Sequence, residues 1–189
     1  MSNVLDWLQF VLAPQMINGM SIGVAVVLMA LGLTIIFGLL DVINMAHGEF
    51  YAIGAYLAVA LLGLGLSFWW ALVLTPLLMA VLGYVTERGL IQRVFHSKDR
   101  HTLTLLLTFG IGLIIEGVFR NQFGSSGLPY RIPPELSGAW DLGFMFMPYY
   151  RGWVVLFSLI VCLATWIVIE KTRLGAYLRA ATENAALVQ

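Results

Sequence analysis

The chain has 189 residues, of which 60% are hydrophobic and only 11% are charged, and its mean hydropathy is +0.91. A soluble domain carries about 25% charged residues, so lipid rather than water is predicted to surround most of this chain. The ten basic and ten acidic residues cancel, which excludes the basic surface of a nucleic-acid-binding protein. The single Cys162 lies in an apolar run, which excludes an internal disulfide and a cysteine metal site. These properties predict an integral membrane protein.

The N-terminal residues 1–14 are predicted to form a short helix at the membrane interface, separate from the first crossing. Trp7 and Phe10 would face the acyl boundary. Pro14 would end this helix, because proline lacks the amide hydrogen that continues helical bonding.

Apolar stretches long enough to cross a bilayer, about 20 residues each, follow along the chain. The turn sequence GLGLS at 63–67 divides one long uncharged stretch into two helices, the first of them short. The expected spans are 16–40, 49–63, 68–88, 102–119 and 152–169. The sequence therefore predicts an all-α, polytopic transmembrane helical bundle, with about five spans in a single domain over 1–189.

Basic residues in the connections predict the orientation, since Lys and Arg gather in the cytoplasmic loops. Residues 87–101 hold four of them and residues 170–189 hold three, whereas 120–151 spreads three over a longer connection. The first two segments are therefore expected inside and the third outside. An odd number of spans then places the N-terminus outside.

Polar residues gather between the first two spans in the sequence DVINMAHGEF, residues 41–50. Asn44, His47 and Glu49 are predicted to hold a helix break, with Glu49 in the first turn of the next helix, where the helix dipole favours an acid. Gly48 would provide backbone freedom. The segment has no Lys or Arg, so it either lies in the cytosol or dips into the membrane, where irregular backbone must face protein or a wet cavity.

Enzyme chemistry has little support in these residues. His47 has no second histidine at metal-ligand spacing, and the chain contains no Gly-x-Ser-x-Gly nucleophile motif. A phosphate-binding loop is also absent, because neither lysine follows a glycine. We therefore expect no metal or cofactor, and any ATP hydrolysis must take place in another subunit. Glu116 lies inside a predicted span and is a functional candidate by default, but Arg120 four residues later favours a structural ion pair.

The segment 170–189 is too polar to cross the membrane again but is rich in helix formers. It consists of Glu170 followed by KTRLGAYLRAATENAALVQ. Its apolar residues recur every three to four positions, which predicts a short amphipathic cytoplasmic helix that lies on lipid or docks into a partner.

Two stretches carry a resemblance to a known family. The first is NGMSIGVAVVLMALGLTIIFGLLDVINMAHGEFYAIGAYLA, residues 18–58, and the second is RLGAYLRAATENAALVQ, residues 173–189. The first resembles the opening of the permease subunits of branched-chain amino-acid ABC importers, and the second resembles their cytoplasmic coupling segment. That family continues with further spans, so the resemblance implies an N-terminal portion of a permease.

The resemblance implies partners and site residues. The partners are a second homologous permease subunit, two cytoplasmic ATP-binding subunits and an external solute-binding protein. The chain itself would lie in the inner (cell) membrane as a multi-pass protein. Residues implied in the translocation path or a helix break are Asn18, Asn44, His47, Gly48 and Glu49. Residues implied in coupling to the ATPase are Gly175, Arg179, Ala180, Glu183 and Asn184.

Three alternatives remain open at this point. Urea and short-chain amide permeases share the His-Gly-Glu signature, so the carried solute is open. An ATPase-independent channel or secondary carrier would need no coupling helix. An intramembrane hydrolase using His47 and Glu49 would require a nucleophile that the sequence does not offer near them.

The predicted topology can be tested by thiol labelling. Because positive residues stay inside, a cysteine in Ser97→Cys should react with an impermeant reagent from the cytoplasmic face only. A cysteine in Ser125→Cys should react from the outer face only. Labelling of both from one side would contradict the topology.

Overall fold

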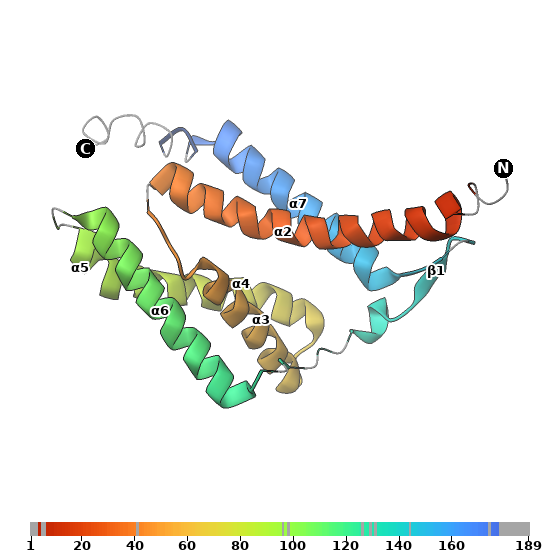
Figure 1. The fold of residues 1–189 in the computed structure, drawn as a ribbon, viewed down its shortest axis with the longest axis horizontal. Helices are drawn as coiled ribbons and strands as arrows, with labels where there is room; N and C mark the ends of the chain where they lie inside the picture. The colour runs from red at the N-terminus through yellow and green to blue at the C-terminus, as the bar shows by residue number, and fades with distance from the viewer. Residues whose placement is uncertain are drawn as a thin grey trace. The chain divides into compact units, whose positions relative to one another are not determined.

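The structure is a computed structural model that describes residues 4, 7–40, 42–95, 97, 99–125, 127–128, 130, 132–143, 145–173 and 175–177. The chain divides into two compact units (Figure 1). The first contains residues 1–34 and 132–189, and the second contains 35–131.

The N-terminal helix does not stop at Pro14. A π-helical turn, η1 (Leu8–Leu12), leads directly into α2 (Ala13–Leu40), whose last residues belong to the second unit. In η1 the amide of Ala13 bonds to the carbonyl of Leu8, one residue beyond α-helical spacing. The wider turn η1 shifts the pattern of backbone hydrogen bonds immediately before Pro14, which has no amide hydrogen to donate. The prediction that Pro14 ends the helix is therefore wrong.

The first unit also contains a short β-hairpin and a long helix. The elements are η3 (Pro134–Leu136), β1 (Ala139–Asp141), β2 (Phe146–Pro148) and α7 (Tyr149–Lys171). The strands pair antiparallel with Trp140 opposite Met147. Asp141 accepts a bond from the amide of Gly143, which has a φ of 78°, and the rings of Trp140 and Tyr149 lie 4.7 Å apart. The hairpin therefore precedes α7 directly and packs on its first residue.

The second unit is built from the helices α3 (His47–Gly63), α4 (Phe68–Thr86), α5 (Gln92–Phe95) and α6 (Arg100–Phe123). The predicted turn after α3 is present, with Gly65 at a φ of 89°, which glycine adopts without strain. A π-helical turn, η2 (Glu87–Ile91), joins α4 to α5. The third predicted span therefore continues as helix well past residue 88, into the connection that the sequence analysis treated as a loop.

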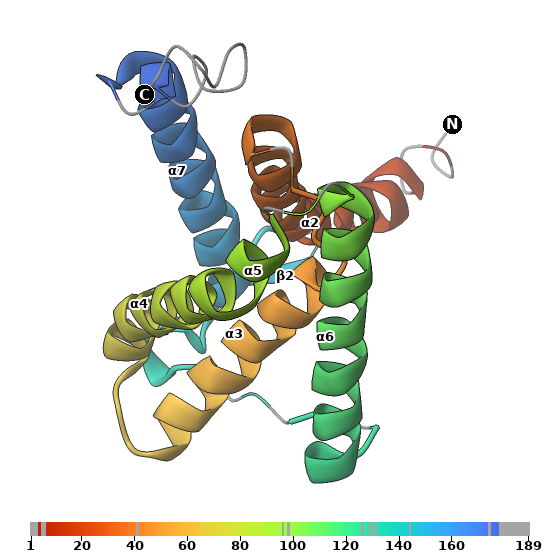
Figure 2. The same ribbon diagram turned by 90° about the vertical axis from the view of Figure 1, so that its left-hand side faces the viewer.

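Helix α3 is the central element of the second unit and packs against both α4 and α6 (Figure 2). Tyr56 of α3 stacks on Phe119 of α6, with ring centroids 4.4 Å apart, and lies 4.6 Å from the ring of Phe123. Aromatic pairs of this kind contribute about 0.5–1.5 kcal/mol beyond the area they bury. They join the middle of α3 to the last turns of α6.

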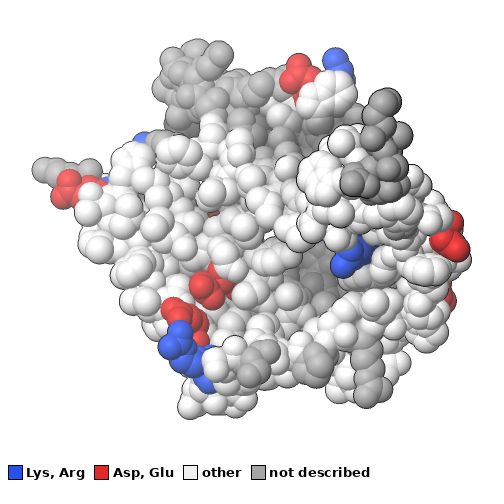
Figure 3. All heavy atoms as spheres, turned by 45° about the vertical axis from the view of Figure 1, so that its right-hand side comes forward, with Lys and Arg blue, Asp and Glu red and all other residues white. Residues whose placement is uncertain are grey.

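The surface is largely uncharged. In the view of Figure 3, most of the described surface belongs to uncharged residues, and the acidic and basic side chains occupy small separate patches. Many large apolar side chains are exposed, among them Ile22 and Ile114 at 68% each. Exposed apolar area of this extent marks a surface that lipid or protein covers.

Four helical stretches among the described residues are long and apolar enough to cross a membrane: Leu8–Gly38, Phe68–Val94, Arg100–Phe123 and Tyr149–Lys171. The predicted all-α polytopic architecture is thereby confirmed. Helix α3 has 17 residues, or about 25 Å at about 1.5 Å per residue, against a hydrocarbon core of about 30 Å. The crossing by α3, and with it the count of five, stays a prediction.

Candidate functional site

The structure contains a helix break between α2 and α3, and Asn44 lies within it. Residues 42–46 are not helical, and α3 begins at His47. The side-chain oxygen of Asn44 accepts a hydrogen bond from the amide of Ala46 at 3.0 Å. The carbonyl of Asn44 accepts from the amide of His47 at 3.4 Å. Asn44 therefore satisfies two amides that the start of a helix leaves without an internal partner.

Thr108 of α6 also bonds to the break, and it is 1% exposed. Its hydroxyl oxygen accepts a hydrogen bond from the amide of Met45 at 3.1 Å. The hydroxyl proton has alternative acceptors in the carbonyls of Thr104 at 2.9 Å and Ile43 at 3.4 Å. One buried side chain thus connects α6 to the backbone on two positions of the break.

The first turn of α3 packs closely on α6. Ala46 is fully buried. A Cβ on Gly112 would lie 3.7 Å from the Cα of Ala46 and 3.7 Å from the Cγ of Glu49. Both distances are ordinary van der Waals contacts, so α6 lies directly against the first turn of α3 at Gly112. Glu49 lies in the first turn of α3 as predicted, and its aliphatic stem faces α6.

Gly48 has a different setting from the predicted one. It is the second residue of α3 and is exposed, and a Cβ added to it would meet nothing within 4 Å. Its φ is not positive. The structure therefore gives no conformational reason for glycine at this position.

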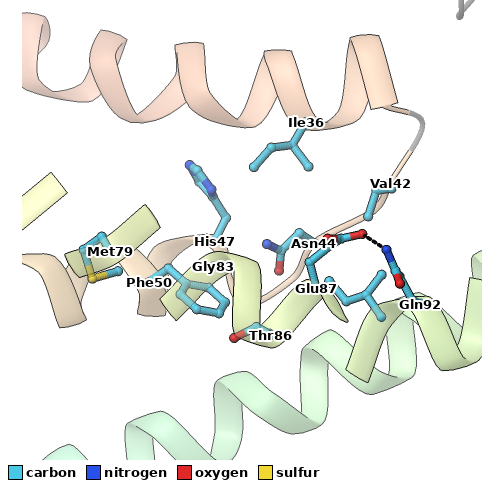
Figure 4. A pocket seen from close by; sticks show the side chains of 11 residues that line it. Ile36, Val42, Asn44, His47, Phe50, Met79, Gly83, Thr86, Glu87 and Gln92 are labelled. Carbon is cyan, nitrogen blue, oxygen red and sulfur yellow. Dashed lines mark hydrogen bonds between the residues drawn. The ribbon is translucent and has the colours of Figure 1, made fainter. Parts of the chain in front are cut away.

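A cavity of about 740 Å³ lies beside the break, within the second unit (Figure 4). Apolar side chains form most of its wall, including Ile36, Phe50 and Met79. Asn44 and His47 contribute from the break and the start of α3. Thr86, Glu87 and Gln92 contribute from the end of α4 and the segment that follows. A largely apolar concavity with a few polar groups is the usual form of a small-molecule site.

A chain of hydrogen bonds begins at two of the cavity residues, Glu87 and Gln92, and continues to Arg88 and Tyr84 outside the lining. Gln92 donates from its amide nitrogen to the carboxylate of Glu87 at 2.8 Å, as the dashed line in Figure 4 marks. Arg88 donates to the side-chain oxygen of Gln92 at 3.2 Å and to the hydroxyl of Tyr84 at 3.2 Å. The π-helical spacing of η2 places Glu87 and Gln92, five residues apart, within bonding distance.

Asn18, the remaining predicted path residue, lies in α2 within the first unit. Its side-chain oxygen accepts a hydrogen bond from the guanidinium of Arg151 in α7. This bond connects two helices that are far apart in the sequence. The structure thus brings Asn44, His47 and Glu49 together in one unit, and gives Asn18 a partner in the other.

The predicted coupling residues lie mostly outside the described residues: Arg179, Ala180, Glu183 and Asn184. Gly175 is described and is buried. A Cβ there would lie under 3 Å from the backbone of Ile169, so only glycine fits without a shift. The chain therefore folds back tightly on the end of α7 at Gly175.

The expected ion pair of α6 is present. Arg120 donates to the carboxylate of Glu116 at 2.7 Å, and the two side chains are 72% and 50% exposed. Glu116 therefore has a structural partner, as the spacing predicted.

Within the described ranges no group of three or more His, Cys, Asp or Glu side chains could hold a metal ion.

Sequence reasoning missed Thr108, Gly112, Glu87 and Gln92. Thr104, Thr108 and Gly112 recur every four residues, so they share one face of α6. A stripe of small and hydroxyl residues inside an apolar span is the signal that could have identified the contact face. Glu87 and Gln92 carry no such signal, because they meet only through the π-helical turn.

The apolar helices and the interrupted pair α2 and α3 define a multi-pass membrane protein. Residues 15–189 match the family described as the permease component of branched-chain amino acid transport systems. The chain belongs to this family.

The chain is also similar to individual curated proteins. It is 29% identical over 186 residues to the high-affinity branched-chain amino acid transport system permease protein LivH of Escherichia coli (strain K12), covering 90% of this chain and 58% of that protein. It is 25% identical over 182 residues to BraD of Pseudomonas aeruginosa, covering 90% and 59%. It is 28% identical over 173 residues to a probable permease of Methanocaldococcus jannaschii, covering 86% and 52%. No solved structure matches the chain.

The contribution of Thr108 to the break can be measured by substitution. Thr108→Val keeps the shape but leaves the amide of Met45 without its acceptor, so the free energy of unfolding should fall by about 1–3 kcal/mol. Thr108→Ser keeps the hydroxyl and should lose less. Thr102→Val, at an exposed position of the same helix, is the control. Thermal unfolding of the purified protein in detergent compares the three. If Thr108→Val is no less stable than Thr102→Val, the bond does not stabilise the break.

Proposed function

We propose that this chain is a membrane-spanning permease subunit of an ATP-driven ABC importer for branched-chain amino acids. The observation that supports this most is the family match over residues 15–189, together with relatives named as high-affinity branched-chain amino acid permeases. The sequence has no phosphate-binding loop, so two cytoplasmic ATP-binding subunits would hydrolyse the nucleotide. A second homologous permease and an external solute-binding protein would complete the importer in the inner membrane.

The break between α2 and α3 would lie at the inner part of the translocation path. Two features support this location: the break borders the cavity through Asn44 and His47, and irregular backbone at membrane depth requires internal partners or a wet cavity. In this proposal the polar cluster is architectural first and contacts the solute second. The N-terminus would lie outside, and the cavity would lie toward the cytoplasmic side.

Residues 170–189 would carry the coupling helix that docks into an ATPase subunit. The tight contact of Gly175 with Ile169 supports a fixed direction of the chain as it leaves α7. A fixed direction matters because a docking helix transmits a displacement only if its connection to the span is stiff.

The whole proposal is tested by uptake into proteoliposomes that contain the assembled complex. Uptake of radiolabelled leucine should require ATP, the ATPase subunits and the solute-binding protein. Uptake that continues without the ATPase subunits would identify a channel or secondary carrier and reject the importer.

The coupling segment has its own test in the same complex. Arg179→Ala or Glu183→Ala should uncouple ATP hydrolysis from leucine uptake while the subunit stays in the membrane, because both side chains lie on the predicted docking helix, about one turn apart. Glu135→Ala, at an exposed position of the predicted outer connection, is the control. Uptake that is unchanged in both variants would make the segment a surface helix only.

The role of His47 is tested by two substitutions of similar size. His47→Gln keeps donors and acceptors and should retain most uptake, whereas His47→Leu should lose about tenfold, as expected when a polar partner costing about 1–3 kcal/mol is removed. Uptake at equal membrane levels is the measurement. Equal loss in both variants would point to proton transfer by the imidazole, and equal tolerance would place the segment in water.

A further inference from the structure

The hairpin of β1 and β2 has two different faces. Trp140 pairs with Met147 across the strands, and Asp141 pairs with Phe146. Because neighbouring residues of a strand point to opposite faces, these two pairs lie on opposite sides of the hairpin. The first pair faces α7, since a Cβ on Gly152 would lie 2.6 Å from the ring of Trp140 and 3.6 Å from the terminal methyl of Met147. The second pair therefore points away from α7, and Phe146 is 72% exposed.

The hairpin is held closely to the start of α7 (Figure 1). Tyr149 donates its amide hydrogen to the carbonyl of Gly138 at 2.9 Å. The ring of Tyr149 occupies the space beside Gly138, where a Cβ would come within 3 Å of it. Gly138 and Gly152 thus each give room to an aromatic ring, so the hairpin has a fixed position on the first turn of α7.

The charges of α7 indicate where this contact lies along the helix. The helix is long and apolar enough to cross a membrane. Its 18 residues 152–169 carry no charge, and at about 1.5 Å per residue they span about 27 Å, close to the hydrocarbon core of about 30 Å. Arg151 and Glu170 then mark the two boundaries of that core. Because Trp140 lies on Gly152, the hairpin contacts α7 at the level where the helix enters the hydrocarbon.

The composition of this region suits the lipid headgroup layer. Six of the 15 residues 139–153 are aromatic, against 13% of the whole chain, and Trp and Tyr are enriched where a membrane meets water. The hairpin has one charged side chain, Asp141, whose carboxylate accepts a hydrogen bond from the amide of Gly143 in the turn. A transient interface with a soluble protein is about as polar as ordinary protein surface. The exposed Phe146, with Leu142 at the turn 42% exposed, favours lipid over such a partner.

We propose that the hairpin anchors α7 at the membrane surface, with Phe146 inserted among the phospholipid headgroups of the leaflet at which α7 begins. The Trp140 side binds the helix and the Phe146 side binds lipid, so the hairpin fixes the level of α7 relative to the leaflet. This role depends neither on the solute that is carried nor on the side of the membrane at which α7 begins.

Spin-label accessibility tests where Phe146 lies. In a Cys162→Ser background, single nitroxide labels are placed at Phe146→Cys, at Glu135→Cys in the same connection, and at Leu156→Cys, an exposed position of α7. The protein is reconstituted in phosphatidylcholine liposomes. Oxygen concentrates in lipid and a nickel chelate concentrates in water, so the ratio of their relaxation effects reports depth. The oxygen-to-nickel ratio at position 146 should be several-fold above that at position 135 and below that at position 156.

The anchoring is tested by the depth of α7. Phe146→Asp puts a charge on the face assigned to lipid, so the label at Leu156→Cys should move toward water, and its oxygen-to-nickel ratio should fall toward the value at position 135. Phe146→Leu keeps an apolar side chain and should leave the ratio unchanged. Ser125→Asp adds the same charge at an exposed position of the same connection, outside the hairpin, and as the matched control should also leave it unchanged. Because Phe146 is exposed, neither substitution there disturbs packing on α7.

Three results would overturn the proposal. A ratio at position 146 equal to that at position 135 would place the hairpin in water. Low access of both reagents at position 146 would show that protein, not lipid, covers this face. An equal depth of the Leu156→Cys label in Phe146→Asp and Ser125→Asp would show that the hairpin does not hold α7 at its level.

Discussion

The second unit depends on one constraint, which is that an interrupted helix leaves backbone groups without helical partners. At the membrane depth that we propose for the break at 42–46, an unsatisfied backbone group would cost several kcal/mol, so side chains must replace the lost helical partners. Asn44 does so from within the break, and Thr108 does so from α6. One turn further along α6, Gly112 lies against Ala46 and Glu49, so two successive turns of α6 are close to the break and the start of α3.

Helix α6 therefore organises both irregular segments. It bonds to the break through Thr108 and packs against η2. The polar groups of the cavity, Asn44 and His47 from the break and Glu87 from η2, are thus positioned by contacts with a single helix. A site whose parts share one support keeps its geometry more precisely than one built on separate loops.

Much of this architecture could be predicted from the sequence, and what could not has identifiable causes. Hydropathy located the long helices, and the polar seam at 41–50 located the break. Thr108 was missed because a hydroxyl in an apolar span can bond within its own helix. Ser21, Thr34, Thr86 and Thr165 all bond back to the carbonyl four residues earlier. The sequence therefore does not distinguish a hydroxyl that also contacts another segment. Pro14 was misread because a π-helical turn, η1, leads the helix into and past the proline. The pair of Glu87 and Gln92 was missed because these residues meet only through the second π-helical turn, η2.

The contacts of α3 also determine how a displacement could reach the cavity. Near His47, α3 is held to α6 by Thr108 and by the close approach at Gly112; at the middle of α3, Tyr56 stacks on Phe119. Two helices joined at two separate places move as one body, because packed side chains do not deform continuously. In the proposed orientation α6 begins at the cytoplasmic side, so a shift imposed there would carry His47 along with it.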